Sequence, residues 1–172
     1  GLTPVVAPNA TPTATPASSA TPAPGATPAQ ALNISTRVRV GLGDNAAIGG
    51  FIIKGATPKA VVIRGIGPSL AALGLTGVLL DPVLEVRSAS GSLLFQNDNW
   101  KDSQRAQIEG GVFQPTDDRE AVIVATLVPG AYTAVLTGKN QTAGVGLVEI
   151  YDLNQAADSE LAIISTRGFL VG

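Results

Sequence analysis

A dense group of side-chain oxygens in the middle of the chain is the first candidate for chemistry. Asn97, Asp98, Asn99 and Asp102 lie close together around Trp100. Asp81 comes earlier in the chain and opens the hairpin pattern that leads to them. Such oxygens are the ligands that calcium takes from loops, which makes a Ca²⁺ site one interpretation. In the other, the Asn and Asp side chains bond to their own backbone and form a turn. The group offers fewer ligands than the roughly six to eight that calcium takes, which favours the turn.

A second group of carboxylates, in residues 116–120, is a weak candidate for catalysis. Glycoside hydrolysis needs two carboxyl groups at a set separation across a cleft, which the adjacent Asp117 and Asp118 in a polar loop rarely supply. We interpret this segment as a solvated turn with Arg119 nearby. The chain has no His and no Cys, the residues most used for acid–base and thiol chemistry. We expect a protein that is not an enzyme, with no small-molecule substrate.

Composition narrows the class of protein further. The formal net charge is -2 and only 14% of residues are charged, so no basic surface indicates a nucleic-acid partner. No uninterrupted apolar run approaches the ~18 residues of a membrane span. Met is absent, and we interpret this as removal of an N-terminal signal peptide, which predicts an extracellular or cell-surface protein. The alternative is an arbitrary boundary of the sequence.

Residues 1–30 differ from the rest of the chain. They are rich in Pro, Thr and Ala, contain repeated Thr-Pro pairs and carry no charge. Proline restricts both itself and the preceding residue, so we expect an extended, polyproline-like arm. One interpretation is a disordered, O-glycosylated spacer. The other is an arm that docks on a neighbouring subunit, with the apolar Leu2, Val5 and Val6 as its anchor.

From residue 31 onward the pattern predicts β-structure. Ile34, Thr36 and Val38 alternate with polar residues, and this period of two marks a half-buried strand. Short strands separated by Gly and Asn turns predict an all-β, jelly-roll-like β-sandwich of residues 31–172, preceded by the arm at 1–30. Nine strands are expected, at 34–40, 50–54, 60–64, 83–87, 92–96, 121–127, 132–137, 146–151 and 163–171. Two short helices are expected at 69–75 and 102–109, with Ser69 and Asp102 as N-caps.

Three segments resemble the bacterial pre-peptidase C-terminal (PPC) type of β-sandwich. Residues 81–86, 91–99 and 129–135 are similar to its D-x-x-L-x-V/L, G-x-x-L-x-x-N-D-D and P-G-x-Y-x-x-x-V patterns. The resemblance covers residues 81–151. It implies an accessory binding module, and in some members of the family a calcium ion at a place comparable to the oxygen group.

A repeated motif extends the resemblance to the whole folded region. Ile-Ser-Thr-Arg occurs at 34–37 and again at 164–167. Together with residues 43–45, 48–51, 64–70 and 144–149, it is similar to tandem repeats of about 130 residues in secreted surface proteins of environmental bacteria. The resemblance implies an extracellular, non-catalytic module.

These features predict a structural subunit that assembles head-to-tail with copies of itself into an extracellular filament. Strand addition at a sheet edge gives directional binding, and contacts that do not close give a filament. The residues expected to assemble lie in the arm and in the last strand: Leu2, Val5, Val6, Ile164, Phe169 and Leu170. The alternative is a PPC-like accessory module of a secreted protein, although few aromatic residues are available to stack on sugars.

Overall fold

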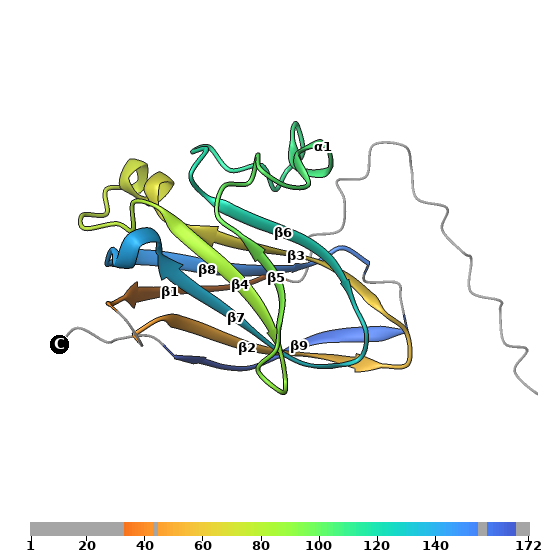
Figure 1. The fold of residues 1–172 in the computed structure, drawn as a ribbon. Coiled ribbons are helices and arrows are strands. Elements are labelled where there is room, and N and C mark those ends of the chain that lie inside the picture. The colour runs from red at the N-terminus through yellow and green to blue at the C-terminus, as the bar shows by residue number, and fades with distance from the viewer. Residues whose placement is uncertain (1–32, 43–44, 155–157, 168–172) are drawn as a thin grey trace, which may run out of the picture.

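The molecule is a sandwich of two antiparallel sheets (Figure 1). The computed structural model describes residues 33–42, 45–154 and 158–167. A four-stranded sheet has the order β1-β8-β3-β6, and a five-stranded sheet has the order β5-β4-β7-β2-β9. The strands are β1 (Asn33–Val40), β2 (Ala47–Gly55), β3 (Lys59–Ile66), β4 (Pro82–Ser88), β5 (Leu93–Asn97), β6 (Ala121–Leu127), β7 (Gly130–Gly138), β8 (Gly144–Asp152) and β9 (Ser159–Arg167).

The strand pairing is that of a jelly roll. β1 pairs with β8, β2 with β7, β3 with β6 and β4 with β5, so that the pairs are nested around the central β4–β5 hairpin. β9 is added beyond β2. The predicted all-β sandwich is confirmed, and each predicted strand overlaps an observed one. The largest error is at β9, which begins at Ser159 rather than 163, because Ser159 and Glu160 carry no apolar signal.

The main core lies between the sheets. Inward residues alternate along each strand, as in β7, where Tyr132, Ala134 and Leu136 are buried. The Tyr132 ring stacks on Phe51 of β2 with centroids 5.5 Å apart. Its hydroxyl donates to the carbonyl of Val128 at 2.7 Å and so fixes the turn between β6 and β7.

Two long connections cover the outer face of the four-stranded sheet. The β3–β4 connection contains the short helix η1 (Pro68–Leu73) and buries Leu70 beside Ile66. The β5–β6 connection contains α1 (Arg105–Ile108) and packs Trp100 and Ile108 on the sheet. Figure 1 shows this second connection rising above β6. Because the loops pack here, this sheet has apolar residues on both of its faces.

The helix starts differ from the sequence prediction. The N-caps are Gly67 and Gln104, and neither makes a side-chain capping bond, so the predicted caps Ser69 and Asp102 are wrong. The Asp102 carboxylate instead accepts a bond from Asn99 at 2.8 Å. Both helices are also shorter than predicted: η1 has six residues and α1 has four, and each lies inside a loop that is held by tertiary contacts.

A buried glutamate anchors η1. Glu120 is fully buried, and its Oε1 accepts bonds from the amides of Gly67 and Ser69 at 3.1 and 2.9 Å and from the Ser69 hydroxyl at 2.6 Å. At Gly67 a Cβ would lie 2.1 Å from the carbonyl oxygen of Leu79, so no larger residue fits this approach. The prediction that Glu120 belongs to a solvated turn is therefore wrong, because its partners come from a distant connection.

A buried ion pair joins the far ends of β3 and β8. Lys59 is fully buried, and its ammonium donates to Asp152 Oδ2 and to the carbonyl of Asn154, both at 2.7 Å. The second oxygen of Asp152 accepts from the Asn154 amide at 2.8 Å. Since both charges are satisfied, the pair fixes the register at this end, where removal of one partner would leave a buried charge alone.

We predict that Asp152→Asn lowers the free energy of unfolding by about 3–5 kcal/mol, because Lys59 then stays buried without a countercharge. Urea unfolding followed by tryptophan fluorescence measures the change. Glu109→Gln is the matched control, since it breaks an exposed pair with Arg105 (2.6 Å) and should shift the midpoint far less. Equal shifts in the two variants would show that the buried pair contributes no more than a surface pair.

Candidate functional site

The predicted calcium ligands form two groups rather than one shell. Asp81 and Asp98 flank the ammonium of Lys139, which lies 3.9 Å from Asp81 Oδ2 and 2.5 Å from Asp98 Oδ2. The Lys139 amide also donates to the carbonyl of Asp81 at 2.8 Å. The side chain of Lys139 therefore supplies a positive charge between the two carboxylates.

The remaining members of the group make hydrogen bonds at the end of β5 and in the loop that follows it. Asn97 Oδ1 accepts from the amide of Val122 at 2.9 Å, and its Nδ2 donates to the carbonyl of Asn99 and to Ser103 Oγ. Asn99 in turn bonds to Asp102. Within the described residues, no three acidic side chains meet in an arrangement that could hold a metal ion. This geometry supports the turn interpretation.

The electrostatics of the first group are unbalanced. Burial raises the pKa of Asp81 above its usual range, and the neighbouring Asp98 raises it further, against a smaller opposing effect of Lys139. Buried Oδ1 atoms of Asp81 and Asp98 have no hydrogen-bond partner. The hydrogen bond to Asp98 raises the pKa of Lys139. One ammonium thus serves two carboxylates that are close together.

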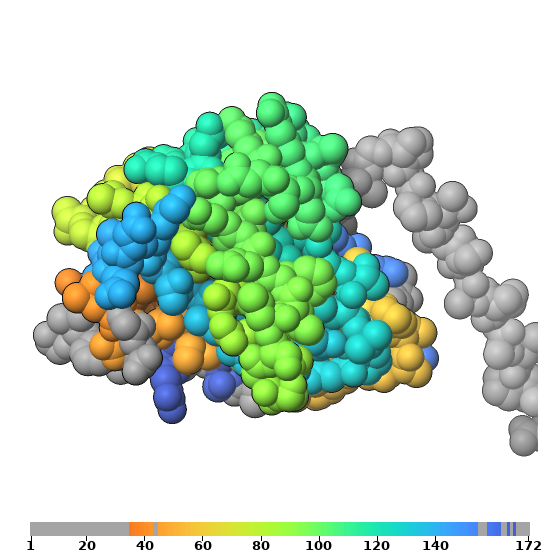
Figure 2. All heavy atoms as spheres, in the orientation of Figure 1, coloured from red at the N-terminus to blue at the C-terminus, as the bar shows by residue number. Residues whose placement is uncertain are grey.

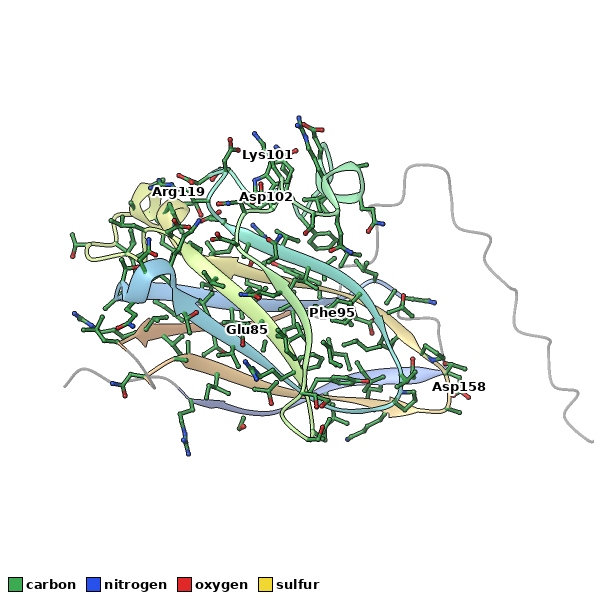
Figure 3. All side chains as sticks on the ribbon, viewed as in Figure 1. Glu85, Phe95, Lys101, Asp102, Arg119 and Asp158 are labelled. Carbon is green, nitrogen blue, oxygen red and sulfur yellow. The ribbon has the colours of Figure 1, made fainter. Side chains whose placement is uncertain are left out.

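The carboxylates of residues 117 and 118 lie in separate surface pairs. Asp117 accepts from the Arg119 guanidinium at 2.9 and 2.8 Å, and Asp118 lies 2.7 Å from the Lys101 ammonium. Figure 3 shows Arg119, Lys101 and Asp102 at the same end of the sandwich, among the loops. The solvated turn with Arg119 nearby is confirmed for Asp117.

The sheet edges are the other candidate for function, and one of them is blocked. β6 ends the four-stranded sheet, and the side chain of Gln104 pairs with its outer side as a strand would. Gln104 Nε2 donates to the carbonyl of Val124 at 2.7 Å, and its Oε1 accepts from the Val124 amide at 2.9 Å. Asn97 satisfies Val122 on the same side. Gln104 adopts the left-handed region, with φ 56°, to reach this position.

The edge strand β5 has no comparable cover among the described residues. It ends the five-stranded sheet and carries no charged residue. Leu93, Leu94 and Phe95 are 48%, 43% and 37% exposed. The β4–β5 hairpin lies across the middle of the face shown in Figure 2, and Figure 3 marks Phe95 on it. An exposed apolar edge strand invites another strand.

The two remaining edges are β1 and β9, and each carries one copy of the repeated motif. Residues 34–37 pair with β8, whereas residues 165–167 pair with β2 in the other sheet. Ile164 lies in β9 where the register with β2 shifts. Both strands expose charges: Arg37 and Arg39 on β1, Glu160 and Arg167 on β9. The other expected assembly residues, Leu2, Val5, Val6, Phe169 and Leu170, lie outside the described residues.

The edges were missed in the sequence because edge position depends on pairing. One local signal was available. Three successive large apolar residues in the predicted strand at 92–96 break the period of two, so this strand carries apolar side chains on both of its faces.

Comparison with known proteins adds no family. The chain matches no model of a known protein family, and a search of curated proteins also finds no match. The resemblances to PPC domains and to tandem surface repeats therefore stay predictions. In the described part of the chain, no helix is both long and apolar enough to span a bilayer.

We predict that EDTA and added calcium leave the melting temperature unchanged. The ammonium of Lys139 already neutralises charge between Asp81 and Asp98, and the oxygens of Asn97 are bound to the protein. Differential scanning fluorimetry measures the melting temperature in EDTA and in calcium under otherwise identical conditions. A lower midpoint in EDTA, reversed by calcium, would establish a calcium site in spite of this geometry.

We predict that Asp81→Asn raises the melting temperature at neutral pH. The pKa of Asp81 is raised in the fold, so the folded state favours the protonated carboxyl group. Asp81 therefore contributes to the stability of the fold at a pH below the usual range of an aspartate, and this contribution is lost as the pH rises through the folded pKa. The gain of the variant should therefore shrink on acidification. Asp117→Asn is the control with the opposite sign, because its hydrogen bond to Arg119 lowers the pKa of Asp117. Thermal melts measure both variants between acid and neutral pH. If the melting temperatures of the two variants change in parallel with pH, the raised pKa of Asp81 is contradicted.

Proposed function

We propose that the protein is a structural, non-catalytic subunit of an extracellular filament, assembled head-to-tail from copies of this chain. The observation that carries the proposal is that both edge strands of the five-stranded sheet lack a partner strand among the described residues. β5 lies at one end of the strand order and β9 at the other. A molecule with an open edge of this kind can accept a strand from a neighbouring copy.

The character of the two ends supports a directional contact. β5 is short, uncharged and apolar, whereas β9 exposes Glu160 and Arg167. An arm that docks on β5 joins two different surfaces, so the contacts between copies are heterologous, and heterologous contacts that do not close produce filaments. The low content of charged residues, 14% of the chain, leaves little repulsion between neighbouring copies.

The uncharged arm of residues 1–30 supplies the second means of connection. At ~3.1 Å per residue, a polyproline-like arm of this length reaches on the order of 90 Å. A folded domain of the size seen here has a radius of gyration of roughly 14 Å, so the arm is long enough to cross a neighbouring copy. An extracellular location belongs to the same proposal.

We predict that deletion of residues 1–30 abolishes filaments but leaves the sandwich folded. The deleted segment precedes β1, and the main core of the described residues is built from the strands that follow it. Negative-stain microscopy measures assembly, and circular dichroism with thermal melting measures folding. If the full chain forms only monodisperse particles, the accessory-module alternative replaces the filament. If the truncated chain still polymerises, the arm is not the link.

A further inference from the structure

One strand edge, β5 (Leu93–Asn97), combines an open backbone with exposed apolar side chains. We propose that β5 receives residues 2–6 of a second copy of this chain as an added strand. The inference rests on the proposed function, since it names the surface on which the arm of a neighbouring subunit docks.

The four sheet edges are not equivalent, and the differences select β5. The outer side of β6 is occupied by the side chains of Gln104 and Asn97. β1 exposes Arg37 and Arg39, and β9 exposes Glu160 and Arg167 near its two ends. β5 alone among the edges of the described sheets has neither a side-chain cap nor a charge, and it has three large apolar residues in exposed positions. Burial of such apolar surface favours the addition of a strand.

The position of Phe95 indicates a particular benefit of strand addition. Phe95 pairs with Val86, whose side chain is fully buried in the core between the sheets. Phe95 therefore belongs to the inward-facing row, yet it is 37% exposed. The core is open at this rim, so an added strand would cover apolar surface as well as satisfy the outer backbone groups of β5.

The chemistry of residues 2–6 fits this edge. The segment Leu-Thr-Pro-Val-Val is uncharged, and three of its five residues are β-branched, which favours a strand. Pro4 has no amide hydrogen, so the segment is suited to an edge strand rather than a central one. Once added to β5, residues 2–6 would form the new edge of the sheet, and the proline in them would discourage the addition of a further strand. Each β5 edge would therefore take one arm, as a linear polymer requires.

Cysteine cross-linking tests the contact in the full chain, because the natural sequence has no Cys. One protein carries Val5→Cys in the arm and a second carries Gln96→Cys on β5. The two are mixed under assembly conditions and treated with a short bis-maleimide. The matched control replaces the second protein with Leu73→Cys, at a residue of η1 that is 76% exposed.

We expect a cross-linked heterodimer from the first mixture and background cross-linking from the control. Equal yields in both mixtures would overturn the proposal. Gln96→Cys protein that cross-links with itself as well as with Val5→Cys protein would show that a second β5 occupies the edge instead. A protein that carries both Val5→Cys and Gln96→Cys and cross-links only within one chain would show that the arm folds back on its own domain. This result would also overturn the proposal.

A charge on the edge provides an independent test. Leu94→Lys should abolish filaments, because an added strand would have to bury the ammonium, while the 43% exposure of Leu94 leaves the fold intact. Leu73→Lys makes the same change at a distant exposed leucine and should leave filaments unchanged. If Leu94→Lys still forms filaments, the β5 contact is refuted, but the proposed function as a filament subunit is not. Absence of filaments in the unaltered protein refutes the proposed function itself.

Discussion

Every strand at the end of a sheet leaves one side of its backbone without a partner strand, and this constraint organises the whole molecule. Nested pairing of eight strands satisfies the interior of both sheets and leaves four edges. The edge of β6 is closed by two side-chain amides, those of Gln104 and Asn97. The edges of β1 and β9 carry charges. β5 has neither form of protection within the described residues, and for this reason the proposed assembly centres on it.

The loops around the four-stranded sheet use their polar groups to bind backbone rather than ligands. Asn97 holds the amide of Val122, Gln104 holds both groups of Val124, and Glu120 holds the start of η1. The same connection buries Trp100 against the sheet. Asn97, a candidate calcium ligand in the sequence, is thus part of this scaffold. In the group of Asp81 and Asp98, a single ammonium is shared by two carboxylates.

Much of the fold could be predicted from the sequence, because strands with one buried face repeat with a period of two. Partners could not be predicted in the same way. Asn97 bonds to a residue 25 positions away and Glu120 to one 53 positions away, and no local pattern encodes either contact. The second copy of Ile-Ser-Thr-Arg was predicted as a strand, yet its partner β2 differs from the partner β8 of the first copy. Identical residues therefore lie at edges of two different sheets.

Hydrogen–deuterium exchange of the amides of β5 tests the central claim most directly, because exchange reports whether an edge is bonded. The measurement compares assembled material with protein dispersed to single subunits, and it follows peptides covering residues 93–97. The account predicts slow exchange in the assembled state and faster exchange in the dispersed state, with β6 protected in both. Exchange at β5 that is the same in the two states, with protection gained elsewhere, would contradict it.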